Sequence, residues 1–205
     1  MIRVFNSGKY DVNIYVIYDE KAKKCAIVDP GVDDRRVMEF IRSKHLTVSS
    51  IILTHGHGDH IIGLEAFKTE TGAKVIAHRA AKEMLRDPKL NLTTMMTGTG
   101  MAIDADIYLE DGAEIEIGSM KWRIIHTPGH TKGSMCLYHD GWLIAGDTLF
   151  FESIGRFDLY GGDYKKLKHS ILEKLLILDD EVIVYPGHGQ ASTIGHERKF
   201  NRMIR

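Results

Sequence analysis

Short apolar runs in the first half of the chain predict β-strands, and segments with apolar residues at helical spacing lie between them. The strand-like runs cover residues 3–5, 13–18, 25–28, 50–53 and 73–77. Helical spacing extends over residues 33–44, 62–71 and 80–85. In the first of these helices Val37, Phe40 and Ile41 fall on one face. This alternation predicts strands that are covered by amphipathic helices.

The second half contains further strands and ends in helices. Strand-like runs cover residues 114–117, 121–125, 134–138, 142–145 and 181–185. Residues 163–178 predict an amphipathic helix, and Thr193 is a candidate N-cap for a last helix that runs toward Arg205. Residues 86–104 have weak periodicity and predict a long loop, a kind of segment that often binds ligands. Because strands and helices are intermixed in both halves, the pattern indicates a layered α/β fold.

The composition fits one domain that spans residues 1–205, with 43% apolar residues available for a core. Since 27 basic and 28 acidic side chains give a formal net charge of −1, there is no broad basic field for nucleic acid. No apolar stretch approaches the ~20 residues of a membrane span, and residues 1–8 lack a signal-peptide pattern. We therefore expect a cytoplasmic protein whose partner is a small-molecule substrate, not nucleic acid or a membrane. The oligomeric state is left without a prediction.

Histidine is unusually frequent, with 11 residues, and three of them lie in the run Thr54-His55-Gly56-His57-Gly58-Asp59-His60. The run follows a predicted buried strand, where a loop can turn side chains toward one point. Imidazole and carboxylate groups are suitable ligands for zinc and similar divalent metals. The two glycines allow tight backbone conformations. This run alone predicts a metal site.

Three more metal-capable side chains follow predicted strands and lie beside glycine: His130, Asp147 and His188. In layered α/β folds, sites are commonly assembled at strand ends. Each of these residues alone is as consistent with a polar turn as with a metal ligand. Together with the run from Thr54 to His60, they indicate one shared metal centre.

In this order the motifs resemble those of the metallo-β-lactamase fold superfamily, in its glyoxalase II-like (hydroxyacylglutathione hydrolase-like) branch. The matching segments, which span most of the chain, are Thr54–His60, His126–Ser134, Gly146–Phe150, Gly155–Leu159 and Pro186–Gly189. The resemblance implies a four-layer αββα sandwich, in which helices cover two packed sheets.

The resemblance also implies a role for each metal-capable residue. A first metal would be held by His55, His57 and His130, a second by Asp59, His60 and His188, and both would be bridged by Asp147. Two divalent ions are implied, with zinc expected and iron or manganese as alternatives. Asp29 matches a family position and is expected to hydrogen-bond to a ligand.

The chemistry implied is hydrolysis of a thioester of the S-2-hydroxyacylglutathione type by attack of a metal-bridging hydroxide. Asp59 and Asp147 are the predicted catalytic residues, which orient the nucleophile and relay its proton. Three alternatives stay open: a persulfide dioxygenase with a single iron, a lactone or other ester hydrolase, and a metal-binding module without catalysis.

Substrate contacts are predicted in the loops near the site. Tyr160, Met95 and Met96 are expected to line the pocket, and Arg156 is expected to support the core, through an ion pair with Asp158. Glyoxalase II has an additional C-terminal helical region that contributes glutathione contacts, whereas this sequence ends soon after the last metal motif. The glutathione site is therefore expected to be incomplete or built differently.

Overall fold

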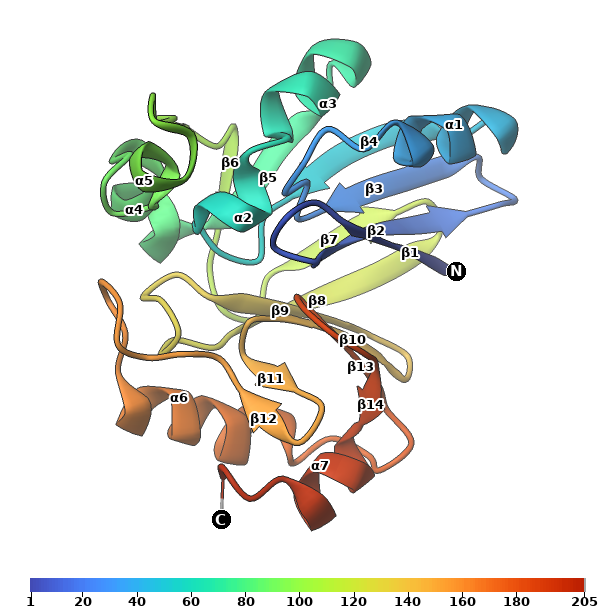
Figure 1. Ribbon diagram of the computed structural model, residues 1–205. Helices are drawn as coiled ribbons and strands as arrows, with labels where there is room; N and C mark the ends of the chain where they lie inside the picture. The colour runs from blue at the N-terminus through green and yellow to red at the C-terminus, as the bar shows by residue number, and fades with distance from the viewer. Residues whose placement is uncertain (205) are drawn as a thin grey trace.

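The computed structural model describes residues 1–204, and its strands form two six-stranded sheets that pack face to face (Figure 1). The first sheet has the order β1-β2-β3-β4-β5-β6, with strands Ile2–Ser7, Val12–Asp19, Lys24–Val28, Thr47–Ile52, Lys74–His78 and Ile107–Leu109. The second has the order β14-β13-β10-β9-β8-β7, with strands Ser192–Thr193, Ile183–Pro186, Trp142–Gly146, Met135–His139, Met120–His126 and Glu114–Ile117. Strands β11 (Leu149–Phe150) and β12 (Ser153–Ile154) form a separate small hairpin.

Strand direction brings several strand ends to one edge of the molecule. In the first sheet β3, β4, β5 and β6 run parallel. In the second sheet β10 and β13 run parallel. Parallel strands end at the same edge of a sheet, so the segments that follow β10 and β13 start close together.

Helices cover the outer faces of both sheets (Figure 1). The helical segments of the first half are α1 (Arg35–Ser43), α2 (Gly58–Ile61), α3 (Leu64–Thr71), the 3₁₀ turn η1 (Arg79–Ala81), α4 (Lys82–Arg86) and α5 (Thr93–Thr97). Those of the second half are α6 (Tyr164–Ser170), the π-helical segment η2 (Ile171–Leu175) and α7 (Ile194–Phe200). Helices α1 and α3 lie on the first sheet, whereas α6 and α7 lie on the second (Figure 1).

Buried apolar clusters fill the spaces between the layers. The cluster between the sheets includes Tyr15, Ile52 and the fully buried Trp122. On the outer side of the first sheet, Phe67 of α3 belongs to a second cluster. On the outer side of the second sheet, Leu167 of α6 belongs to a third. The predicted four-layer αββα sandwich is therefore confirmed.

One predicted loop is partly helical. Residues 86–104 contain α5, and Asn91 organises this segment with polar contacts. Its side chain accepts a hydrogen bond from the backbone N–H of Thr93 and donates to the carbonyls of Leu85 and Met101. Such contacts leave no apolar periodicity, so the pattern of the sequence does not reveal this helix.

The last helices start after side chains that cap them, Asp163 and Thr193. The long helix of the second half starts after Asp163 and changes to π-helical geometry at Ile171. Thr193 caps α7 as predicted, whereas Arg205 lies outside the described residues. Within residues 1–204, no helix has the length and apolar character needed to cross a membrane.

Candidate metal centre

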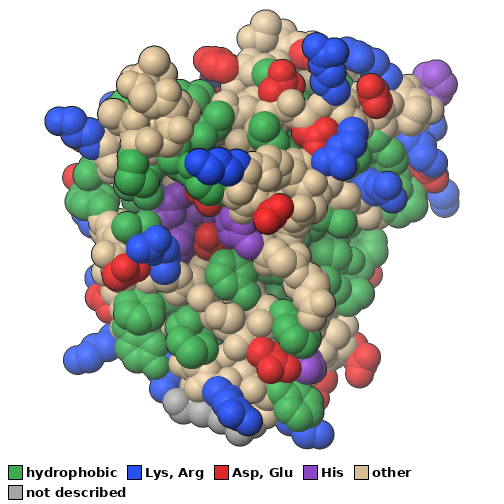
Figure 2. Space-filling model, viewed as in Figure 1, with side chains coloured by type: hydrophobic (Ala, Val, Ile, Leu, Met, Phe, Trp, Pro, Cys, Tyr) green, Lys and Arg blue, Asp and Glu red, His purple; other side chains and the backbone are tan. Residues whose placement is uncertain are grey.

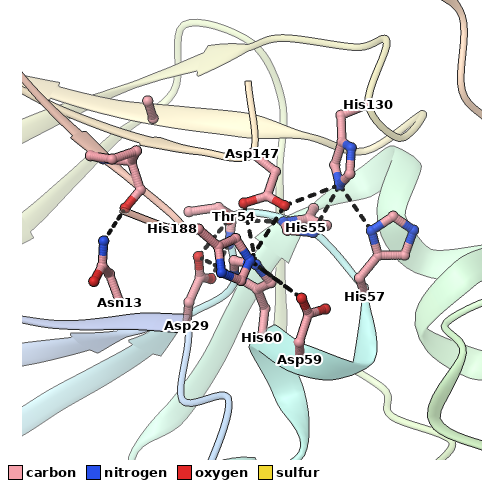
Figure 3. A network of polar contacts seen from close by, with 12 residues as sticks. Asn13, Asp29, Thr54, His55, His57, Asp59, His60, His130, Asp147 and His188 are labelled. Carbon is pink, nitrogen blue, oxygen red and sulfur yellow. Dashed lines mark hydrogen bonds and ion pairs between the residues drawn. The ribbon is translucent and has the colours of Figure 1, made fainter. Parts of the chain in front are cut away.

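The seven predicted ligands lie together at the strand ends of both sheets (Figure 3). The first sheet supplies the run that starts after β4, in which His57 precedes α2 and Asp59 and His60 lie within it. The second sheet supplies His130 after β8, Asp147 directly after β10, and His188 two residues after the end of β13. Figure 2 shows histidine and acidic side chains in a hollow between the two halves, with hydrophobic side chains around it.

Three buried histidines form the first group: His55, His57 and His130, whose ligand nitrogens lie within 4.8 Å of one another. His130 Nε2 lies 2.9 Å from His57 Nδ1 and 3.2 Å from His55 Nε2. Three imidazole nitrogens directed at one point match the protein ligands of a catalytic zinc site, which leaves a further position open.

Asp59, His60 and His188 form the second group. His188 Nε2 lies 3.2 Å from His60 Nε2 and 3.3 Å from Asp59 Oδ2. Asp147 lies between the two groups, with Oδ1 3.3 Å from His60 Nε2 and Oδ2 3.6 Å from His130 Nε2. This geometry fits the bridging role predicted for Asp147.

Hydrogen bonds on the far side of the rings direct their Nε2 atoms into the centre. His60 Nδ1 donates to Asp29 Oδ2 at 2.9 Å, and His130 Nδ1 donates to the carbonyl of Arg156 at 2.7 Å. Because Nδ1 carries the proton, Nε2 has the lone pair that a metal ion accepts. Asp29 therefore makes the contact with a ligand that its sequence position predicts.

The same carboxylate orients a second ring through Thr54. Thr54 Oγ1 donates to Asp29 Oδ2 at 2.6 Å, so its oxygen accepts a hydrogen bond from His55 Nδ1 at 3.1 Å. Asp29 also accepts the backbone N–H of Thr54 at 2.7 Å. One buried carboxylate thus holds His60 directly and His55 through a hydroxyl.

The two groups differ in charge. Burial, followed by the charge of His130, lowers the pKa of His57 to about 3, and burial also lowers the pKa of His55. For His60 burial favours the neutral ring, but neighbouring carboxylates, Asp147 foremost, outweigh it and raise the pKa. The first group is therefore neutral at neutral pH, and the carboxylates of the second group attract positive charge, as a metal ion would supply.

The residues fit a pair of divalent metal ions. One buried atom at the centre, Asp147 Oδ1, has no hydrogen-bond partner among the described residues. A buried polar atom without a partner costs about 1–3 kcal/mol. The imidazole and carboxylate donors match zinc, iron or manganese. A cation would satisfy the Asp147 oxygen and separate imidazole lone pairs that otherwise face one another.

Close packing beside the centre requires glycine before the last histidine. A Cβ atom on Gly187 would lie 2.1 Å from Asp147 Oδ1 and 2.7 Å from His60 Cε1. Real Cβ atoms do not approach other atoms so closely, and any side chain here would displace two ligands. The turn that presents His188 is therefore made with glycine.

Two buried residues of β2, Asn13 and Tyr15, hold the loop that carries His188; Figure 3 shows Asn13. Asn13 Nδ2 donates to the carbonyls of Pro186 at 3.0 Å and Gly189 at 2.8 Å. The Tyr15 hydroxyl donates to the same Pro186 carbonyl at 2.6 Å. We call this pair the β2 clamp. It was not predicted, and the only signal for it is an asparagine within an otherwise apolar strand.

A cavity of about 190 Å³ opens onto the centre. Besides ligands, its lining includes Tyr10, Leu92, Met95, Met96 and Leu159. Met95 and Met96 therefore lie where substrate contacts are predicted. Tyr160 is not among the described lining residues, and its hydroxyl accepts a hydrogen bond from Lys132 Nζ at 3.0 Å.

Arg156 also lines this cavity. Its Nε lies 2.8 Å from Asp158 Oδ1, so the expected ion pair is present. The expectation that Arg156 supports the core is wrong, because the side chains of the pair are 59% and 63% exposed. A guanidinium held by a neighbouring carboxylate therefore forms part of the cavity wall.

Comparison with known proteins agrees with this geometry. The family model described as the metallo-beta-lactamase superfamily matches residues 7–188. An uncharacterised protein of Mycobacterium leprae is 37% identical, over 100% of this chain and 98% of the relative. The probable metallo-hydrolase YqgX of Bacillus subtilis is 36% identical, over 96% and 94%. Hydroxyacylglutathione hydrolase GloC of Haemophilus influenzae is 32% identical, over 99% and 97%.

Solved structures give the same result. BLEG-1, a B3 metallo-beta-lactamase, has a TM-score of 0.92 at 36% identity, over 100% of this chain and 99% of that one. ETHE1 from Myxococcus xanthus has a TM-score of 0.83 at 25% identity, over 98% and 83%. A protein solved in a di-iron-bound form has a TM-score of 0.84 at 27% identity, over 98% of each chain. The chain therefore belongs to the metallo-beta-lactamase superfamily, a superfamily of metallo-hydrolases.

Proposed function

We propose that this protein is a dinuclear metallo-hydrolase that cleaves a thioester of the S-2-hydroxyacylglutathione type. The observation that carries the proposal is the presence of two complete ligand groups, with Asp147 between them, beside an open cavity. Two complete groups favour a dinuclear centre over the single iron of a persulfide dioxygenase. The cavity gives a substrate access to the centre, which favours catalysis over a metal-binding module.

Two divalent metal ions bound in this centre would supply a water nucleophile of lowered pKa and positive charge for the developing oxyanion. Asp59 and Asp147 would orient the nucleophile. The Asp59 side chain is 21% exposed and lines the cavity, so it can accept the proton of the nucleophile and release it to solvent. Met95 and Met96 would provide an apolar wall for the substrate.

The thiols of the chain do not compete for the role of nucleophile. Cys25 and Cys136 are both buried. Burial raises the pKa of the Cys25 thiol to about 12 and that of the Cys136 thiol to about 11. Neither therefore supplies a thiolate at neutral pH.

A glutathione thioester is supported by the relative from Haemophilus influenzae, which is named a hydroxyacylglutathione hydrolase and is matched over 97% of its length. The hydroxyacylglutathione hydrolase of Pseudomonas aeruginosa is 33% identical, but only 62% of it is matched. A protein named a hydroxyacylglutathione hydrolase is thus matched by this chain over nearly its whole length. This supports a glutathione thioester as the substrate class.

The test is steady-state hydrolysis of S-lactoylglutathione by protein loaded with zinc, iron or manganese, with metal content measured by plasma spectrometry. We expect a kcat/KM above about 10⁴ M⁻¹ s⁻¹ with at least one metal. Asp147→Asn should abolish turnover, whereas Asp179→Asn, a change of the same kind at an exposed residue that does not line the cavity, should retain it. Negligible thioester turnover by fully loaded protein would overturn the proposal.

The same experiment separates the other activities. The similarity to BLEG-1 at 36% identity is a specific reason to include β-lactams in the substrate panel. Hydrolysis of lactones in the same panel tests the alternative of a lactone or other ester hydrolase. Oxygen uptake with glutathione persulfide by protein that contains one iron per chain would support a persulfide dioxygenase in place of the hydrolase.

A further inference from the structure

A second cavity adjoins the metal centre on the side of Asp59. It has a volume of about 150 Å³ and lies between the turn that joins β1 to β2 and the start of α2. Its walls include Gly8, Tyr10, Val12, Val32 and Ile62. Tyr10 and Asp59 line this cavity and also the cavity over the centre. The two cavities are therefore adjacent, with these two lining residues in common.

Close backbone packing sets this cavity against a metal ligand. Gly31 forms part of its lining. A Cβ atom on Gly31 would lie 1.7 Å from the carbonyl oxygen of Asp59 and 2.6 Å from Val12 Cγ1. Because Gly31 has no side chain, its backbone packs directly against the backbone of Asp59. A group bound in this cavity would be next to the second ligand group.

The aliphatic side chains of the walls favour an uncharged group. The lining residue Lys9 places Nζ over the ring of Tyr10, 5.5 Å from its centroid. Asp59 Oδ2 faces His188 Nε2 at 3.3 Å. A second carboxylate in this cavity would lose its hydration among Val12, Val32 and Ile62, which is unfavourable. A hydrocarbon chain would contact Val32 and the other aliphatic side chains, where burial stabilises it.

We propose that this second cavity, which we call the acyl pocket, binds the aliphatic chain of a 2-hydroxyacyl group longer than lactoyl. An aliphatic cavity of about 150 Å³ holds a molecule the size of benzene, so the pocket has room for a chain of several carbons. The inference rests on the proposed function, because it places the acyl group at the metal centre. The thiol carrier would then occupy the cavity lined by Met95 and Met96.

The test measures binding of product-like acids to zinc-loaded protein by calorimetry, so it does not depend on turnover. The probes are glycolate, lactate, 2-hydroxybutyrate, 2-hydroxyhexanoate and malate. Each buried methylene should tighten binding about fourfold, up to the capacity of the pocket. Malate carries a second carboxylate and should bind no more tightly than glycolate.

Substitutions at Val32 locate the effect. Val32→Phe fills the acyl pocket and should remove the dependence of binding on chain length. Val32→Ala enlarges the pocket and should extend the dependence to longer acids. The matched control is Val4→Phe on strand β1, at a side chain that is 46% exposed and does not line the pocket. This control should behave as the wild type does.

Two results would overturn the acyl pocket: binding by the wild type that is independent of chain length, or a dependence that survives Val32→Phe. If Val32→Phe does not fold, Val32→Ala is sufficient to test the acyl pocket. If the longest acid that still gains affinity is the same for Val32→Ala and the wild type, the inference is contradicted. Failure of S-lactoylglutathione hydrolysis with an intact chain-length dependence would overturn the proposed function and leave the pocket standing.

Discussion

Asn13→Ala should weaken one metal site and spare the other. Asn13 is 3% exposed, and its side chain donates two hydrogen bonds, to the carbonyls of Pro186 and Gly189 on either side of His188. Each hydrogen bond contributes about 1 kcal/mol net, so the substitution removes about 2 kcal/mol of support from this loop. If that support serves to hold His188 in place, metal binding at the second group should weaken about 30-fold.

The assay is titration of metal-free protein with zinc against a competing chelator that resolves two binding steps. The first group does not involve this loop, so its affinity should change less than twofold. The matched control is Asn201→Ala, because Asn201 is also buried and donates two hydrogen bonds, to the Ser153 carbonyl and to Glu197. The control should lower the free energy of unfolding by a similar amount without changing either step. Equal weakening of both steps, or of neither, would refute a positioning role for the β2 clamp.

Three further predictions concern packing, pH and metal removal. Gly187→Ala should lower zinc affinity at both groups, measured by the same titration, because its Cβ would lie 2.1 Å from Asp147 Oδ1; unchanged affinity would contradict the bridging role. Burial and then His126 lower the pKa of His78 from 6.5 to about 4, so the unfolded chain binds a proton that the folded one does not, and stability should fall as pH drops from about 6.5 to about 4. Denaturant unfolding measured across this pH range should show that the free energy of unfolding falls less steeply with decreasing pH for His78→Phe than for the wild type. An equally steep fall would refute the assignment. A chelator should lower Tm reversibly, since an ion at a thousand times its Kd adds about 4 kcal/mol to stability, and an unchanged Tm in calorimetry would show that the centre binds no ion tightly.

The ligands could be predicted from the sequence because each belongs to a local pattern. His130, Asp147 and His188 each follow a strand and lie beside a glycine, and parallel strands bring such positions to one edge. The contact between Asp29 and His60 follows from the same strand-end geometry. The layered architecture was predictable for a similar reason, because the spacing of apolar residues sets the face that each element buries.

The remaining features depend on contacts between distant parts of the chain. Asn13 and Pro186 are 173 residues apart, so no window of sequence connects them. The exposure of Arg156 depends on how its loop leaves the second sheet, which the neighbouring residues do not encode. Likewise the acyl pocket exists only because the β1–β2 turn packs beside α2.

The distribution of ligands over both sheets gives the metal ions a role resembling that of disulfide bonds. His55 and His130 are 75 residues apart, and His60 and His188 are 128 residues apart, so each ion would close a long loop of the chain. For a covalent cross-link, closing a loop of 100 residues removes about 4.7 kcal/mol of unfolded-state entropy in the loop-closure model. Both cysteines are free. The cross-links that hold the two halves together would thus respond to the supply of metal and not to the redox potential of the surroundings.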